Sequence, residues 1–347
     1  MTKGIKSFFF IYIFSSTLFS RECLDKDLRK FFTERHEQKS QNWCYAYTAA
    51  DLINFQFQQT LIGKKISPLH IALLNLANDQ LPYNSNDGGD VKDGVSLALA
   101  PYNSMFGIFN KGICFDTLEK KITRRNNTDF RTNKELLEEL FFLQKAFNQA
   151  KKSQSFILFD EALKKFIESN DFFSRISLEQ WYFLFKNSNP INLGIHFIDL
   201  FCSPSERFIN AVNTISVFKW ELGRNIRLKV NGSYKDIFLE DPQIIVNKIK
   251  ERLEQDQPTA LNFYLDFLIS KNPRFLSGSL HAVSVVGMNR IGDSCHLIIK
   301  NSWGSCYDKE GKSKYSNKVS KCDDGFLWID EKWISKSLHS IDFLAPL

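Results

Sequence analysis

The sequence predicts an α+β fold with two lobes of different class, and three observations lead to this prediction. Segments with apolar residues at three-to-four spacing, typical of helices, dominate the chain as far as residue 254. Short apolar runs separated by turn residues, typical of buried strands, dominate from residue 259 onward. A reactive cysteine lies in the first part, and a histidine and an asparagine suited to act with it lie in the second.

The overall composition is that of a globular protein. The chain has 347 residues, of which 43% are hydrophobic and 24% are charged, enough for one large domain or two modest ones. The net charge of +6 is mild, and the lysines and arginines are spread along the chain. We therefore expect no nucleic-acid partner.

The N-terminus resembles a secretory signal peptide. Lys3 and Lys6 precede an apolar stretch over residues 7–19, which is short for a membrane-spanning helix. We expect a signal peptide over residues 1–20 with cleavage near Ser20; the alternative is an uncleaved anchor. The mature protein would then be secreted or periplasmic, with no stable membrane association and no room for a long inhibitory propeptide before the first site residue.

Helical patterns follow in order through the first part of the chain. The pattern from Asn42 predicts a helix that ends at Gly63, and Ser67 with Pro68 predicts a second helix through Asn78. Residues 84–89, NSNDGG, are typical of a turn-rich loop, and residues 94–100 are again helical in pattern. These segments would form a helical lobe over residues 21–114.

Residues 115–241 differ in character and predict a helical insert. Residues 134–152, 159–169 and 177–187 have one apolar face and one face of lysine and glutamate. Another helix is expected over residues 242–254. Strands are expected within residues 259–269, 281–288, 295–303 and 325–330, which would form a β-rich lobe over residues 242–347.

The cysteine count indicates one free thiol. Export implies an oxidising compartment, where the seven cysteines can form at most three disulfides. Cys44 is the natural free thiol. Cys306 and Cys322 flank a lysine-rich loop, and we expect them to pair; the other pairings stay open. A solvated loop is a better interpretation of these lysines than a site for a polyanion.

Four residues in fixed order supply the parts of an acyl-transfer site. Cys44 lies where the first helix begins, where backbone N–H groups and a nearby imidazolium would lower the thiol pKa. His281 would project from a strand end, and Asn301 could orient its imidazole. Gln38 could act with the Cys44 N–H as a two-donor oxyanion hole. Trp303 could cover the bond between Asn301 and His281 from water.

A second histidine competes with His281 for the role of base. His296 is close to Asn301 in the sequence, but it falls within an apolar run, CHLIIK. A histidine in such a strand is more often a structural residue, so we favour His281.

These segments together resemble the active-site blocks of the papain/cathepsin family of cysteine peptidases. QKSQNWCYAY, HAVSVVGM and NSWG match in order, and Gly88 with Gly89 resembles the family's substrate-binding loop. The resemblance implies a papain-like two-lobed fold, with catalytic Cys44, His281, Asn301 and Gln38, and substrate contacts from Gly88, Gly89 and Trp303. It implies peptide-bond hydrolysis with no metal or cofactor, in a secreted, bacterial-type member.

The departures from the family pattern are also informative. A half-cystine pair usual in the family is replaced by Gln41 and Asn86, and Tyr45 and Leu280 flank the site. Cys44 and His281 are 237 residues apart, well above the usual separation of roughly 130–150. The helical insert accounts for the excess.

Two alternatives to a peptidase stay open. A catalytically inactive protein could use the same fold for binding, with the insert as its recognition surface. A transpeptidase or transamidase could use the same thioester with an amine as acceptor. The expected partners are a peptide or protein substrate and a protein inhibitor or other partner at the helical insert.

Overall fold

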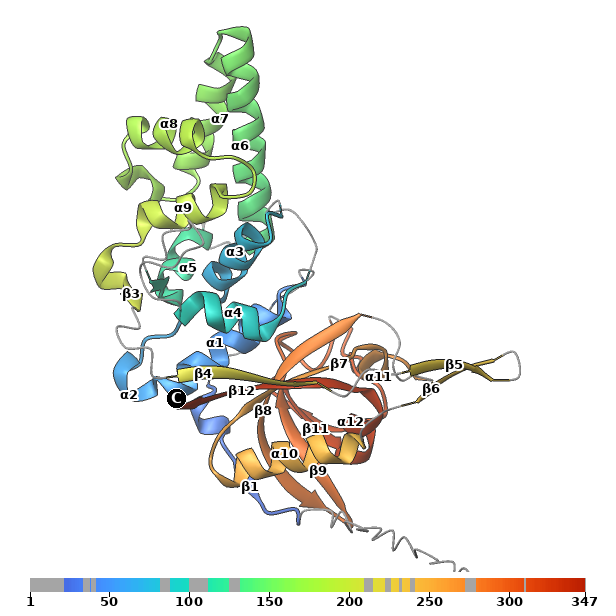
Figure 1. Cartoon of the computed structure of the whole chain (residues 1–347). Helices are drawn as coiled ribbons and strands as arrows, with labels where there is room; N and C mark the ends of the chain where they lie inside the picture. The colour runs from blue at the N-terminus through green and yellow to red at the C-terminus, as the bar shows by residue number, and fades with distance from the viewer. Residues whose placement is uncertain are drawn as a thin grey trace, which may run out of the picture.

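The chain has an α+β fold, as the sequence predicts (Figure 1). The computed structural model describes residues 22–33, 38, 42–81, 88–99, 112–124, 132–208, 215–221, 226–230, 233–237, 241–271, 279–308 and 310–346. The expected signal peptide, the position of Asn86 and the position of Gln41 lie outside these residues. Helices gather at one end of the molecule and a large sheet at the other.

The helical lobe contains α1 (Cys44–Gln56), α2 (Gln58–Leu61), α3 (Pro68–Asn78), α4 (Val91–Leu99) and α5 (Asp116–Thr123). The hydroxyl of Ser67 accepts the backbone N–H of His70 and caps α3, as the Ser-Pro pair predicts. The prediction of a single helix from Asn42 to Gly63 is wrong in one respect. The segment forms two helices, α1 and α2, which are separated at Phe57. α1 is buried on nearly all sides and packs against three strands of the sheet: β7 (Thr259–Tyr264), β8 (Leu280–Ile291) and β12 (Leu338–Pro346).

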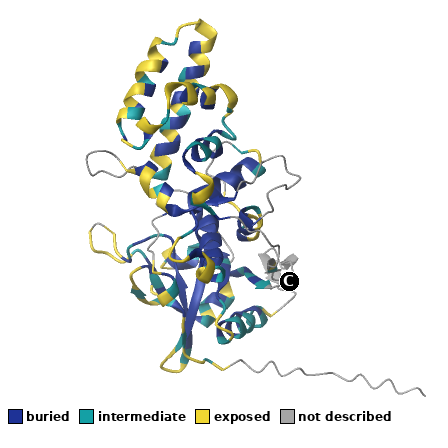
Figure 2. Ribbon diagram, turned by 90° about the vertical axis from the view of Figure 1, so that its left-hand side faces the viewer, coloured by how far each residue is buried: buried dark blue, intermediate teal, exposed yellow. Residues whose placement is uncertain are grey.

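Four further helices stand above this lobe: α6 (Asn133–Ser153), α7 (Ile157–Glu168), α8 (Leu178–Asn187) and α9 (Leu193–Phe201). Capping boxes begin α6 and α8, as expected for Thr and Ser followed three residues later by Glu or Gln. Their core is aromatic, with Phe173, Trp181 and Phe197 packed together. α9 packs on α3, so this core continues into the helical lobe (Figure 2).

The range of the expected helical insert, residues 115–241, contains strands as well as helices. The helices end at Phe201, and the strands β3 (Arg207–Phe208), β4 (Ile215–Glu221), β5 (Ile226–Val230) and β6 (Ser233–Ile237) follow. β3 pairs with β2 (Ile113–Cys114), and β4 pairs with β12 at the edge of the main sheet. The chain therefore returns to the sheet lobe through a strand before α10 begins.

The sheet lobe is built on antiparallel pairs in the order β10-β11-β9-β8-β7-β12-β4, and β1 (Lys26–Asp27) pairs with β8 beside this path. The strands are β7 (Thr259–Tyr264), β8 (Leu280–Ile291), β9 (Ser294–Lys300), β10 (Val319–Asp323), β11 (Phe326–Asp330) and β12 (Leu338–Pro346). Helices α10 (Pro242–Glu254), α11 (Asp266–Ile269) and α12 (Glu331–Ser337) accompany the sheet. Short 3-10 helices occupy Arg29–Phe31, Phe173–Arg175 and Pro204–Glu206.

The disulfides tie distant parts of each lobe together. Cys306 pairs with Cys322, as predicted, and Cys44 is free. The other bonds join Cys23 to Cys295 and Cys114 to Cys202. The second of these closes the base of the upper helices, and the first holds the N-terminal segment against β9. Within the described residues, no helix combines the length and apolar character needed to cross a membrane.

Candidate active site

Cys44 is the first residue of α1, at the junction between the two lobes. Its Sγ accepts the backbone N–H of Ala282 at 3.4 Å, a contact between residues 238 positions apart. Ala282 directly follows His281 in β8, so the packing of α1 on this strand brings the thiol against the backbone one residue beyond the histidine. Cys44, from the helical lobe, therefore contacts the strand of the sheet lobe that carries His281.

His281 and Asn301 meet across neighbouring strands. β8 and β9 are antiparallel, and Asn301 follows the last residue of β9. The Nε2 atom of His281 lies 2.9 Å from Oδ1 of Asn301, and both side chains are buried. Since Oδ1 can only accept, Nε2 carries the proton, which leaves Nδ1 as the proton acceptor of a neutral imidazole.

Aromatic rings cover this pair. The Trp303 ring lies 4.7 Å from the His281 ring between centroids, as expected for an indole that shields the bond to Asn301. Phe263 contacts the imidazole in an edge-to-face arrangement, with 5.7 Å between ring centroids. Tyr315 stacks in parallel with Trp303, with 6.1 Å between ring centroids. The imidazole is therefore fixed in orientation by packing as well as by its hydrogen bond.

Tyr315 is a site residue that sequence reasoning missed. The Nδ2 atom of Asn301 donates to the Tyr315 hydroxyl at 3.1 Å, which fixes which end of the amide faces His281. Tyr315 belongs to the lysine-rich loop closed by the Cys306–Cys322 disulfide. The loop therefore has an inner, buried face that supports the site. Two tyrosines within a polar loop, Tyr307 and Tyr315, were the signal available in the sequence.

Gln38 lies against the residue that follows Asn301. Its backbone N–H donates to the Ser302 carbonyl at 2.7 Å, and its Oε1 accepts the Ser302 hydroxyl at 2.6 Å. The side chain is buried. Because Oε1 is the acceptor end, the amide nitrogen is the end that can donate elsewhere. Ser302 is a second positioning residue that the sequence did not single out.

The Gly-Gly pair passes close to α1. A Cβ at Gly89 would lie 2.6 Å from Cζ of Tyr45 and 2.7 Å from Nδ2 of Asn75, distances too short for any side chain. A Cβ at Gly88 would lie 3.7 Å from the carbonyl oxygen of Asn42, an ordinary contact. Only glycine at position 89 lets this backbone run beside the residue that follows Cys44.

Burial decides the protonation of the central pair. It raises the pKa of the Cys44 thiol, although the N–H groups of Ala282 and Tyr45 act in the opposite direction. Burial also lowers the pKa of His281 to about 4, against the effect of the bond to Asn301. The helix N-terminus and the imidazole were expected to lower the pKa of the Cys44 thiol. That expectation is wrong, because burial outweighs them in this structure. Both groups are neutral at pH 7.

A buried ion pair beside the site joins the two lobes. Nζ of Lys300 lies 2.7 Å from Oδ1 of Asp51, and the Ser284 hydroxyl donates to Oδ2 of Asp51 at 3.1 Å. Asp51 lies two turns along α1 from Cys44, and Lys300 directly precedes Asn301. The sequence did not identify this pair, because lysines and aspartates are common on surfaces.

The rival His296 has a structural role. Its Nε2 lies 2.9 Å from the Ser320 hydroxyl, and its Nδ1 lies 3.3 Å from the carbonyl oxygen of Ser294. Both partners belong to β9 and β10, away from Cys44. Among the described residues, no group of three or more His, Cys, Asp or Glu side chains is arranged to hold a metal ion.

Comparisons with known proteins found distant structural likenesses. No protein-family model and no curated protein matches the chain. A structure from work on the mite allergens Blo t 1 and Der p 1 is 11% identical, with a TM-score of 0.44, and the match covers 95% of this chain and 73% of that one. Digestive procathepsin L 3 of Tenebrio molitor larval midgut is 11% identical, with a TM-score of 0.41 and coverage of 92% and 69%. The proCathepsin B S9 from Trypanosoma congolense is 13% identical, with a TM-score of 0.42 and coverage of 94% and 79%.

At these TM-scores the likenesses carry no argument about what this chain does, and they give no support to the expected bacterial-type member. The agreement with the expected papain-like, two-lobed α+β arrangement comes from the chain's own elements. Cys44 begins the first helix of the helical lobe, and His281 and Asn301 lie on neighbouring strands of the β-rich lobe.

Proposed function

We propose that this chain is a cysteine peptidase in which Cys44 is the nucleophile, His281 the general base and acid, and Asn301 the residue that orients His281. The observation that carries this proposal is a pair of contacts at two adjacent residues of β8, His281 and Ala282. Sγ of Cys44 touches the N–H of the next residue, Ala282, and Nε2 of His281 contacts Asn301. Nucleophile, base and orienting group are the parts that acyl transfer requires.

The neutral resting pair defines the first step of the proposed mechanism. Sγ of Cys44 forms a bond to the carbonyl carbon of the peptide, and the thiol proton passes to Nδ1 of His281 in the same step. The carbonyl π electrons move to oxygen, where the Cys44 N–H and the Gln38 amide would donate hydrogen bonds. The contact of Gln38 with Ser302 supports this role. Because the Gln38 amide oxygen accepts the Ser302 hydroxyl, the amide nitrogen is the end that can donate to the substrate oxygen.

The second half of the reaction reverses the proton transfer. The imidazolium of His281 gives its proton to the leaving nitrogen as the carbon–nitrogen bond breaks, and a thioester on Cys44 remains. Water then attacks the thioester carbon while His281 takes up a proton from it. The carbon–sulfur bond breaks, the carboxylic acid product leaves, and His281 returns the proton to Sγ, which restores the thiol. Asn301 stabilises the imidazolium through the same bond that holds the neutral ring.

Substrate contacts are proposed for Gly88, Gly89 and Trp303. The close approach of Gly89 to Tyr45 supports this role, since an extended peptide could then reach backbone groups beside Cys44. The disulfides support the further proposal that the chain is secreted after removal of residues 1–20, because such bonds persist in oxidising compartments.

The test is turnover of a fluorogenic peptide library by the purified chain and by matched variants. We expect Cys44→Ala and His281→Ala to abolish hydrolysis, whereas His296→Ala, a histidine variant in the same lobe, retains it. Equal unfolding midpoints would show that the inactive variants fold. Residual hydrolysis by Cys44→Ala at the rate of the parent chain would refute the assignment. A primary amine added to the same assay distinguishes hydrolysis from transamidation, since the amine would appear in the product.

One observation favours a second candidate, a catalytically inactive protein that binds peptides on the same fold. The thiol and imidazole are both buried, at 8% and 3% exposed, and both are neutral. No hydrolysis of any library peptide, together with saturable binding of peptides to the parent chain, would favour this candidate.

A further inference from the structure

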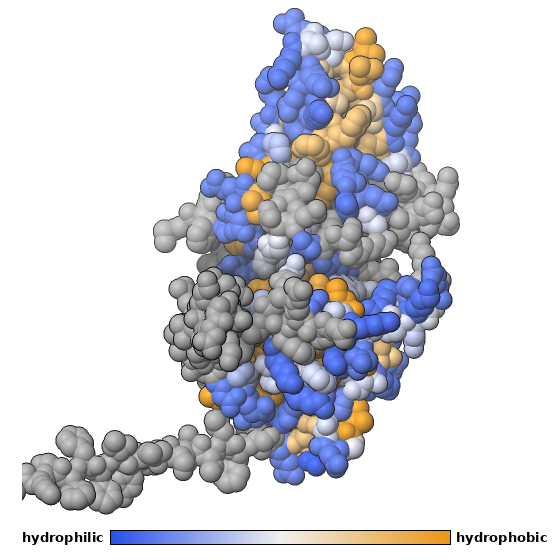
Figure 3. Space-filling view, turned by 90° about the vertical axis from the view of Figure 1, so that its right-hand side faces the viewer, coloured by the Kyte–Doolittle hydropathy of each residue, from blue (hydrophilic) through white to orange (hydrophobic). Residues whose placement is uncertain are grey.

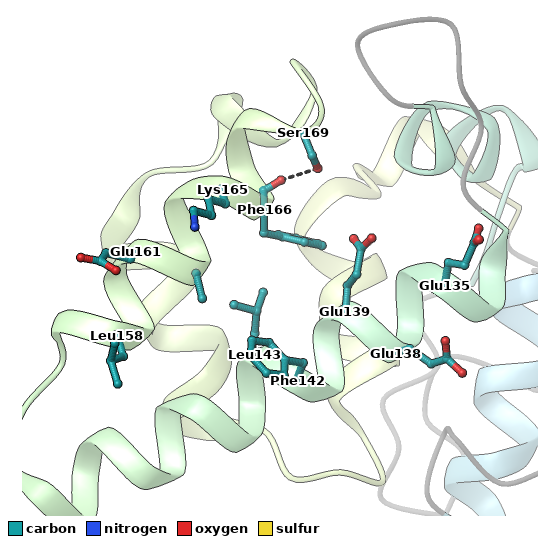
Figure 4. Close-up of a pocket in the computed structure, with 11 residues that line it drawn as sticks. Glu135, Glu138, Glu139, Phe142, Leu143, Leu158, Glu161, Lys165, Phe166 and Ser169 are labelled. Carbon is teal, nitrogen blue, oxygen red and sulfur yellow. Dashed lines mark hydrogen bonds between the residues drawn. The ribbon is translucent and has the colours of Figure 1, made fainter.

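A groove runs between α6 and α7 (Figure 4), and these helices stand well above α1 and β8, which carry Cys44 and His281 (Figure 1). It encloses about 690 Å³, within the range of about 300–1,000 Å³ of ligand-binding pockets. The α6 residues that line it are 135, 138, 139, 142 and 143, and the α7 residues are 158, 161, 162, 165 and 166, with residue 169 just beyond the end of α7. Each set follows the three-to-four spacing of one helix face, so two helix faces line one channel.

The groove has an apolar floor, in which Leu143 and Phe166 are buried, whereas Phe142 and Leu158 are open to solvent. Leu143 and Phe166 lie between the helices, and Phe142 and Leu158 extend outward with 63% and 79% of their surfaces exposed. Figure 3 shows apolar side chains gathered in a strip over the upper helices, with polar side chains on either side. A strip of this kind typically marks an interaction site.

The margin of the groove is acidic on a chain that is basic overall. Glu135, Glu138, Glu139 and Glu161 line it, against one cation, Lys165. Within the fold, Glu135 closes the capping box of α6, and Oε1 of Glu138 lies 3.9 Å from Nζ of Lys134 one turn earlier. The chain as a whole carries a net charge of +6, so the local excess of carboxylates is not a general property of its surface.

We propose that the groove between α6 and α7 binds a basic amphipathic segment of a partner protein. The apolar face of that segment would lie mainly on the exposed Phe142 and Leu158, as an amphipathic helix lies in an apolar groove. Its lysines or arginines would face the glutamates of the margin. Charge complementarity selects this occupant over an acidic segment.

The test uses the full chain with Cys44→Ala, so that no probe is cleaved whatever the activity of the site. The probe is a fluorescent helical peptide of leucine and lysine, with leucine at three-to-four spacing. One control peptide has the same residues in scrambled order, and another has glutamate in place of lysine. Fluorescence anisotropy should show binding of the first peptide alone, with an affinity that falls as salt increases.

Matched variants locate the binding. Leu158→Ser and Glu138→Gln combined with Glu161→Gln should each weaken binding about tenfold or more. Phe183→Ser and Glu179→Gln alter exposed residues of α8 outside the groove and should leave binding unchanged. All these positions are exposed, so the variants should fold.

Three results would overturn the proposal. The first is no binding of the leucine–lysine peptide, and the second is equal binding of the scrambled or glutamate peptide. The third is a dimer of the chain, seen by sedimentation, that Leu158→Ser dissociates, because the groove would then bind a second copy. None of these results bears on the peptidase assignment, which is tested by turnover.

Discussion

Replacing Lys300 with methionine should destabilise the protein severely, because it leaves the carboxylate of Asp51 buried without its cation. The two side chains are 5% and 7% exposed, and 2.7 Å separates Nζ from Oδ1. The Ser284 hydroxyl would remain as a partner of Asp51, but a hydroxyl carries no charge. The pair spans the two lobes, since Asp51 is in α1 and Lys300 is in β9.

The magnitude follows from the distance and the burial. At an effective dielectric constant of about 20, two unit charges 2.7 Å apart attract by about 6 kcal/mol. Much of this attraction offsets the cost of removing both charges from water. Removing one partner of a buried pair typically costs about 3–5 kcal/mol, because the remaining charge has no compensation. We expect Lys300→Met to lower the free energy of unfolding by about 3–5 kcal/mol.

The assay is urea unfolding of a double-mutant cycle. Lys300→Met and Asp51→Leu should each be strongly destabilising, and the double variant should recover most of the loss, because an apolar pair replaces an ionic one. Lys312→Met is the matched control. Lys312 contacts Glu310 at the same 2.7 Å, but the two side chains are 75% and 72% exposed, so its loss should be below about 1 kcal/mol. Equal losses for Lys300→Met and Lys312→Met would refute the reasoning.

Three further predictions concern the site and its acid stability. Gln38→Ala should lower kcat by about 10²–10³-fold with little change in KM, the scale for one oxyanion donor, as measured by steady-state kinetics. Tyr315→Phe leaves Nδ2 of Asn301 without its acceptor and should cost about 1–3 kcal/mol in unfolding experiments, with a lower kcat. Burial lowers the pKa values of His70 and His281 from 6.5 to about 4. Between these pH values the two histidines are protonated in the unfolded protein and neutral in the native protein. Stability should therefore fall as the pH drops from 6.5 toward 4, by about 3 kcal/mol for each histidine, and His70→Asn should remove about half of that slope. A stability that does not change over this pH range would contradict the assigned burial.

The sequence was a good guide to the central contacts of the candidate site. Cys44, His281 and Asn301 lie in distant segments, but each segment had a recognisable local setting: a helix start, a strand start and a strand end. Those settings determine where a side chain lies once α1 packs on β8. Tyr315 escaped notice because its contact with Asn301 depends on how a polar loop folds inward, which no local pattern encodes.

The parts of the prediction that were wrong depended on tertiary structure. β4 lies in a range dominated by helical patterns, and it is a strand because β12 offers it an edge to pair with. The division of the expected first helix at Phe57 likewise has no strong breaker in the sequence. The thiol pKa was expected to fall because a helix N-terminus and an imidazole are visible in sequence, whereas the burial that raises it is not.

The most direct test of the proposed function is labelling of Cys44 by a peptidyl epoxide, read as an intact mass and a mapped peptide. The account predicts one adduct, on Cys44, formed rapidly at pH 7 and lost in His281→Ala, because the imidazole must take the thiol proton as sulfur attacks. Iodoacetamide, which offers no peptide to bind, should react slowly at pH 7 and faster as the pH rises, since burial raises the pKa of the thiol. No epoxide adduct, or an adduct that forms equally fast in His281→Ala, would contradict the account.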